Sequence, residues 1–119
     1  MKKNDRVITE WGIGTIAEYI AVDWTVDRYA VLLDVTRNGW EEMLPYFYNH
    51  EVYPLTSKDS IEKELTEIIP DKETLNNFKI YLDKNGFKDI VQHTQLMLAG
   101  MGIDVSKKAI ILYQAFKQI

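Results

Sequence analysis

The spacing of the hydrophobic residues changes once along this chain of 119 residues, and that change constrains the fold more than any other feature. Up to residue 55, apolar and β-branched residues come in short runs separated by turn residues, as in β-strands. From residue 58 onwards they recur every three to four residues, as on one face of an α-helix. We therefore predict an α+β chain, with an all-β domain over residues 1–55 and a helical domain over residues 58–119.

Five short strands are predicted in the first half. We expect them at residues 6–9, 15–22, 29–35, 40–44 and 52–53. Asn38-Gly39 is a strong two-residue hairpin signal and would join the third strand to the fourth. Pro45 would break the ladder after the fourth strand, because proline has no backbone N–H to donate. Five short strands with turns between them fit a small SH3-like β-barrel.

Three to four helices with short turns are predicted in the second half. The apolar face of the first comprises Ile61, Leu65, Ile68 and Ile69. Asp59 and Glu62 have the spacing of a capping box, and Pro70 would end this helix. Residues 71–85, 87–101 and 104–119 follow, with Asp71 and Asp104 as N-caps and Gly86 as a stop signal. The junction at residues 55–57 is too short for a flexible linker, so we expect the helical domain to pack on the barrel.

Composition excludes several classes of site. The chain has no cysteine, which rules out disulfides, zinc–thiolate sites and thiol nucleophiles. No run approaches the roughly 20 apolar residues that a membrane span needs. The basic start from Met1 to Arg6 has no apolar stretch after it, as a signal peptide would. We therefore expect a cytoplasmic protein.

The charge is placed unevenly. Residues 1–55 hold five basic and nine acidic side chains, a net charge of −4, whereas residues 56–119 hold nine of each. An acidic barrel repels a phosphate backbone unless its few cations cluster. Nucleic-acid binding through the barrel is therefore not expected.

The segment from Asp5 to Ile16 carries a strand, Asp5-Arg6-Val7, followed by the turn Trp11-Gly12-Ile13-Gly14-Thr15-Ile16. This pattern resembles the start of bacterial Tudor-like barrels, such as the C-terminal domain of UvrD/PcrA-type helicases, and of the related CarD-type transcription factors. The resemblance covers residues 3–55 only. It implies a barrel that docks on a protein partner, RNA polymerase or a DNA-repair factor.

Aromatic residues are the main functional lead. Nine lie in the first half: Trp11, Tyr19, Trp24, Tyr29, Trp40, Tyr46, Phe47, Tyr48 and Tyr53. A small barrel buries only part of such a set, so these rings either pack in the core and against the helices or form an exposed recognition surface. Trp24 and Trp40 are the best candidates for that surface, because each lies beside turn and acidic residues.

The acidic residues next to these tryptophans are Asp23, Asp27, Glu41 and Glu42. Paired carboxylates can perform acid–base chemistry or hold a metal, but no Asp-x-Asp or similar ligand spacing is present. A solvated acidic rim is the simpler interpretation, and it would favour a basic protein surface as partner.

No motif indicates catalysis. His50 and His93 are the only histidines, and neither lies in a His-x-x-Glu-His frame. No serine lies in a Gly-x-Ser-x-Gly turn, and Gly12-Ile13-Gly14 lacks the third glycine of a nucleotide fingerprint. We therefore predict a non-enzymatic adaptor in transcription or repair, with no catalytic residue, no cofactor and no metal.

An alternative function rests on the helical half. Residues 98–106 are weakly similar to a helix-turn-helix, although a structural helix hairpin is the interpretation that we favour. Lys107, Lys108 and Lys117 follow and could contact phosphates, which would make the chain a nucleic-acid-binding regulator. A third possibility is a homo-oligomer assembled through exposed helix faces.

Overall fold

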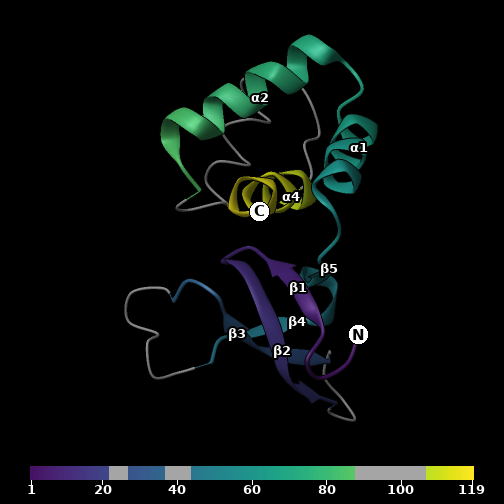
Figure 1. Ribbon diagram of the computed structural model, residues 1–119, viewed down its shortest axis with the longest axis vertical. Helices are drawn as coiled ribbons and strands as arrows, with labels where there is room; N and C mark the ends of the chain where they lie inside the picture. The colour runs from purple at the N-terminus through teal and green to yellow at the C-terminus, as the bar shows by residue number, and fades with distance from the viewer. Residues whose placement is uncertain (22–26, 37–43, 88–106) are drawn as a thin grey trace. The chain divides into compact units, whose positions relative to one another are not determined.

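A computed structural model describes residues 1–21, 27–36, 44–87 and 107–119 (Figure 1). The chain divides into two compact units, Met1–Leu55 and Thr56–Lys117, which are described separately below.

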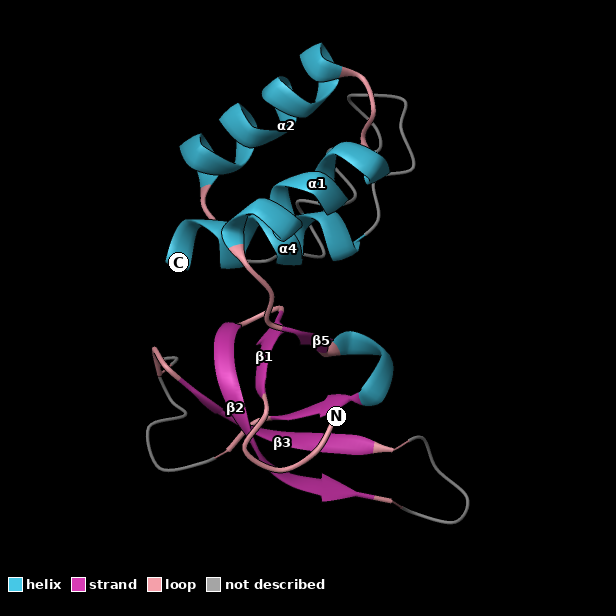
Figure 2. Cartoon of the chain, turned by 45° about the vertical axis from the view of Figure 1, so that its right-hand side comes forward, coloured by secondary structure: helices cyan, strands magenta, loops and turns pink. Residues whose placement is uncertain are grey.

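The first unit is a five-stranded antiparallel sheet (Figure 2). Its strands are β1 (Arg6–Thr9), β2 (Gly12–Ile20), β3 (Arg28–Leu33), β4 (Tyr46–Tyr48) and β5 (Tyr53–Pro54), with the 3₁₀-helix η1 (Asn49–Glu51) before β5. The spatial order is β4-β3-β2-β1-β5. The first four strands therefore form a meander, and β5 returns to pair with β1.

These elements confirm the α+β class and the antiparallel sheet, but not the closed barrel. Strands β4 and β5 are the two edges of the sheet, and no ladder joins them in the described part of the chain. The predicted strand at residues 40–44 and the Asn38-Gly39 hairpin lie almost entirely outside the described residues. Only Leu44 is described, and it lies outside any strand.

Strand β4 corrects the prediction that Pro45 breaks the ladder. The Val31 N–H donates to the Pro45 carbonyl across 3.1 Å, so Pro45 already faces β3. Proline cannot return that hydrogen bond, because it has no N–H. It is tolerated here because Pro45 lies immediately before an edge strand, where one ladder bond can be left unmade. The ladder then continues through Tyr46, Phe47 and Tyr48, which pair with Ala30, Tyr29 and Arg28.

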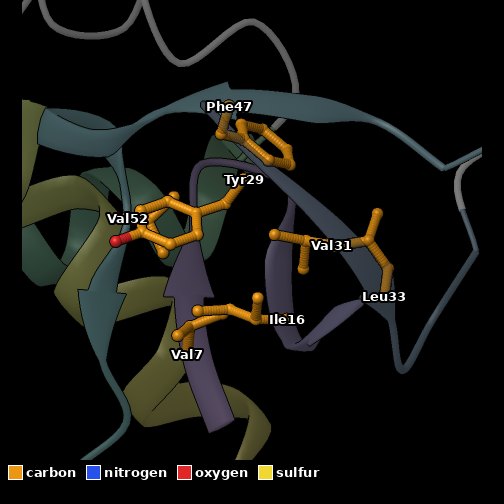
Figure 3. Close-up of a cluster of buried hydrophobic side chains, with 7 residues drawn as sticks. All are labelled: Val7, Ile16, Tyr29, Val31, Leu33, Phe47 and Val52. Carbon is orange, nitrogen blue, oxygen red and sulfur yellow. The ribbon is translucent and has the colours of Figure 1, made fainter. Parts of the chain in front are cut away.

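The core of the first unit lies on one face of the sheet (Figure 3). It contains Val7, Ile16, Tyr29, Val31, Leu33, Phe47 and Val52. Tyr29, Val31 and Leu33 are alternate residues of β3, as the two-residue period of a strand requires. The Trp11 ring packs edge-on against Phe47, with 5.5 Å between ring centroids.

The second unit contains three described helices, α1 (Lys58–Ile68), α2 (Lys72–Asn85) and α4 (Lys107–Gln118). Most of the predicted third helix and the Asp104 cap lie outside the described residues. The buried apolar residues include Ile61, Leu65, Ile69, Leu75, Phe78, Leu82, Ala109 and Leu112. None of these three helices is long and apolar enough to cross a membrane.

The helix ends follow the sequence at three of the four predicted positions among the described residues, and α1 ends at Ile68, just before Pro70. The Asp71 carboxylate accepts the Thr74 N–H at 3.0 Å, and Gly86 ends α2 with a φ of 79°. The predicted capping box of Asp59 and Glu62 is wrong, because the N-cap of α1 is Ser57, whose hydroxyl accepts the Ser60 N–H at 3.1 Å. The helix starts earlier than predicted, which places Asp59 in its first turn.

Gly14 gives the sharpest test of the sheet. A Cβ at this position would lie 2.6 Å from Val31 Cγ1 and 2.7 Å from the Leu32 carbonyl oxygen. We predict that Gly14→Ala lowers the free energy of unfolding by about 1–3 kcal/mol, measured by chemical denaturation of the full chain. Glu18→Ala, an exposed change on the same strand, is expected to stay within about 0.5 kcal/mol of the wild type. Equal midpoints for all three proteins would contradict the close approach of β2 and β3.

Candidate functional site

The predicted partner-binding residues fall mostly on segments that the structure does not describe. Trp24, Trp40, Asp23, Glu41 and Glu42 lie outside the described residues, and Asp27 alone lies within them. The Asp27 carboxylate accepts a hydrogen bond from the Tyr19 hydroxyl, which raises the pKa of Tyr19. Asp27 therefore orients the side chain of Tyr19, a contact that was not predicted from the sequence.

An exposed surface of aromatic and aliphatic side chains lies on the side of β3 and β4 that faces away from the core. Four large side chains there are well exposed: Leu32 by 58%, Tyr46 by 55%, Tyr48 by 41% and Leu44 by 37%. A strand with one solvated face normally carries polar residues at such positions. We call Arg28, Ala30, Leu32, Leu44, Tyr46 and Tyr48 the outer β3–β4 face.

The register of the sheet arranges this face in rows. Tyr46 is the cross-strand partner of Ala30, and Tyr48 is the partner of Arg28. The hydrogen bond between Val31 and Pro45 continues the same register, so Leu44 follows opposite Leu32. Residues that pair directly across strands share one side of a sheet. The exposed apolar side chains are therefore neighbours on two adjacent strands.

Tyr48 is held in place by three contacts. The Arg28 guanidinium lies over its ring, with Cζ 5.2 Å from the ring centroid. The His50 ring stacks on it at 5.7 Å with an interplanar angle of 7°. Its backbone N–H donates to Glu51 Oε1 at 3.2 Å. A surface cation–π contact contributes about 0.5–1 kcal/mol, so the ring is oriented before any partner binds.

An ion pair lies at the border of this face that is nearer to β1. The Arg6 guanidinium makes a two-pronged ion pair with Asp34 and also donates to Thr15 Oγ1 at 2.9 Å. The hydrogen bond from Arg6 lowers the pKa of Asp34. Because both side chains are nearly half exposed, we regard this pair as a boundary of the face rather than as a major source of stability.

The three lysines proposed for nucleic-acid binding lie on α4 of the second unit. Lys107 and Lys108 are half-buried. The Lys117 ammonium lies 3.3 Å from the Asp83 carboxylate. Two further lysines are also engaged: Lys79 lies 2.7 Å from Glu62, and Lys58 lies 4.8 Å from the centroid of the Phe116 ring.

Asp83 and Tyr113 form the centre of this network. The Tyr113 hydroxyl donates to Asp83 Oδ1 at 2.8 Å. Burial and this hydrogen bond raise the pKa of Tyr113, and the same bond, together with Lys117, lowers the pKa of Asp83. The network ties α2 to α4 by a carboxylate that is stabilised in its charged form.

No family model, no curated protein and no solved structure matches this chain. The resemblance of residues 3–55 to Tudor-like barrels therefore stays a prediction from the motif alone. No group of three His, Asp or Glu side chains that could hold a metal ion occurs among residues 1–21, 27–36, 44–87 and 107–119.

Sequence reasoning named Tyr46 and Tyr48 within the aromatic set but did not place them on one surface. The available signal was the alternation of Leu44, Tyr46 and Tyr48 with Pro45 and Phe47, which has the period of a strand. We did not predict a strand from this alternation, because we expected Pro45 to end the ladder. Leu32 gave no signal, because it lies within a continuous apolar run.

The Asp83 network predicts a pH dependence of stability. A folded-state pKa below the ordinary value of about 3.9 means that the carboxylate stabilises the fold above that pH, and that this contribution is lost as the pH falls through the lower pKa. We expect Asp83→Asn to lose less stability than the wild type between pH 7 and pH 3, measured by denaturant titration. Tyr113→Phe, which removes the largest cause of the shift, should show part of the same effect. Identical losses of stability in the wild type and both variants would contradict a role of Asp83 in the pH dependence.

Proposed function

We propose that the chain is a non-enzymatic protein-binding adaptor whose sheet unit docks on a partner protein through the outer β3–β4 face. The observation that carries this proposal is the exposure of Leu32 on β3, of Tyr46 and Tyr48 on the adjacent β4, and of Leu44 just before β4. Exposed apolar side chains that gather on one surface are typical of interaction sites. Tyrosine is also among the residues that contribute most to protein–protein affinity.

The way the face is built supports the same function. Its side chains project from paired strands, and Tyr48 is oriented by Arg28 and His50. A preorganised aromatic surface loses little conformational entropy on binding, which favours affinity. Because the strands are already paired, the sheet can present this surface without a conformational change around a ligand.

The charge of the first half indicates the kind of partner. Residues 1–55 carry a net charge of −4, which favours approach to a basic protein surface and disfavours a nucleic acid or a second copy of the same unit. From the resemblance to Tudor-like barrels we also propose that the first unit is an SH3-like barrel. The same resemblance makes RNA polymerase or a DNA-repair factor the first cytoplasmic partner to test. A role in transcription regulation would follow from such a partner.

The first test is the loss of partner binding by variants of this face. We predict that Leu32→Ser and Tyr46→Ser each weaken binding of a partner captured from host lysate, and that the double variant weakens it at least about tenfold. The melting temperature should stay within a few degrees, because both side chains are exposed. Calorimetric titration with the purified partner gives the dissociation constant.

A matched control is Ile80→Ser on α2, whose side chain is 54% exposed in the other unit. This variant should bind as the wild type does. Full binding by the double variant would overturn the proposal. Trp24→Ala and Trp40→Ala belong in the same panel, since their partner-binding role is a prediction from sequence, and a large fall in melting temperature would assign them to the core instead.

The nucleic-acid alternative has its own test. We expect the intact chain to bind duplex DNA weakly, with an affinity that falls steeply with salt, because any contact would come from a few lysines such as Lys107, Lys108 and Lys117. Fluorescence anisotropy at 50 and 200 mM salt measures both quantities. Tight binding that resists salt would replace the adaptor proposal by a nucleic-acid-binding regulator.

A further inference from the structure

Two large side chains on this side of the sheet, Tyr46 and Glu18, make no side-chain hydrogen bond, ion pair or ring contact within the described part of the chain. Tyr46 has an exposed ring with no stacking partner there, whereas Tyr48 is engaged by Arg28 and His50. Glu18 on β2 is exposed and has no ion pair or hydrogen-bond partner in the same described residues. An open aromatic ring and an open carboxylate are both available to a ligand.

The sheet places these two groups in one row. Ala30 pairs with Tyr46 on one side and with Glu18 on the other, so the three residues lie side by side on β4, β3 and β2. Neighbouring strands lie about 4.8 Å apart, which puts the outer two backbones roughly 10 Å apart. Ala30 contributes only a methyl group to this row, so its own side chain does not separate the Tyr46 ring from the Glu18 carboxylate.

A β-bulge creates this row. The register between β2 and β3 shifts between Ile16 and Glu18, where Ala17 is the extra residue. Without the shift, Ala17 would be opposite Ala30 and Glu18 would be opposite Tyr29, on the core side of the sheet. Bulges re-aim side chains in this way and are frequent next to functional sites.

We propose that Tyr46 and Glu18 bind an arginine side chain of the partner protein, with the guanidinium over the Tyr46 ring and an ion pair to the Glu18 carboxylate. Arginine fits this arrangement better than lysine, because its planar group stacks on an aromatic ring and donates to a carboxylate at the same time. This inference rests on the proposed function, since it names one contact within that interface.

The surrounding charges agree with a cationic ligand. The first half carries a net charge of −4, and Glu18 is not neutralised within the described residues. Arg28 is the neighbouring cation on this face, two residues from Ala30, and its guanidinium lies over the Tyr48 ring. The Tyr46 ring is therefore open to a second cation, which would lie over it as the Arg28 guanidinium lies over the Tyr48 ring.

The test titrates the ¹⁵N-labelled full chain with N-acetyl-arginine amide and follows the amide resonances of Glu18, Ala30 and Tyr46. We expect saturable shifts at these residues at millimolar ligand, and much smaller ones with the neutral isostere N-acetyl-citrulline amide. Glu18→Gln and Tyr46→Ala should each weaken arginine binding about three- to fivefold. Tyr46→Phe should retain binding, since it keeps an aromatic ring.

Glu67→Gln, the same change at an exposed carboxylate of α1, serves as the control and should leave arginine binding unchanged. The absence of shifts, or equal shifts with citrulline, would overturn the arginine site. With the purified partner, loss of binding in Leu32→Ser but full binding in Glu18→Gln would overturn this inference and leave the proposed function intact. Full binding by Leu32→Ser and the Leu32/Tyr46 double variant would instead contradict the proposed function, while the arginine titration still reports on the site itself.

Discussion

The ladder between β2 and β3 is the constraint on which the rest of the sheet unit depends. At Gly14 the backbone and a side chain of β3 leave no room for a Cβ, and the ladder runs from there to the pair Ile20 and Arg28. A slip of one residue would move every side chain of a strand to the opposite face. The ladder therefore fixes both the buried cluster around Val31 and the exposed residues behind it. The bulge at Ala17 is part of the same constraint, because it changes which face receives Glu18.

Sequence patterns predicted the elements whose signals are local. The runs that became β1, β2 and β3 were recognised from their apolar residues, and Asp71 and Gly86 act within one helical turn of their own position. The start of β2 was predicted wrongly, because Gly12 and Gly14, which were expected in a turn, pair with β1 in the ladder. Ser57 was missed because two possible caps lie close together and tertiary packing decides where the helix begins. Strand β4 was missed for another reason. Whether a proline ends a strand or begins an edge strand depends on the strand it pairs with, which is distant in sequence.

The candidate surface was less predictable than the fold. The composition of residues 1–53 showed that more aromatic rings are present than a small sheet can bury, and that conclusion holds for Tyr46 and Tyr48. The choice of which rings stay exposed depends on register, since Phe47 is buried between two exposed tyrosines. Leu32 and Val31 are adjacent and chemically alike, yet only the pairing with β2 and β4 separates the exposed one from the buried one.

The end of β4 has a consequence for solubility. An exposed apolar face next to an edge strand is a combination that promotes strand-to-strand aggregation. Here the edge is only three residues long, η1 follows it directly, and Glu51 occupies the N–H of Tyr48, which by the alternation of the ladder points away from β3. A foreign strand would find a single outward N–H on β4, that of Tyr46. Strand β4 can thus display tyrosine rings to a partner while its own backbone offers almost no template for a second copy of the chain.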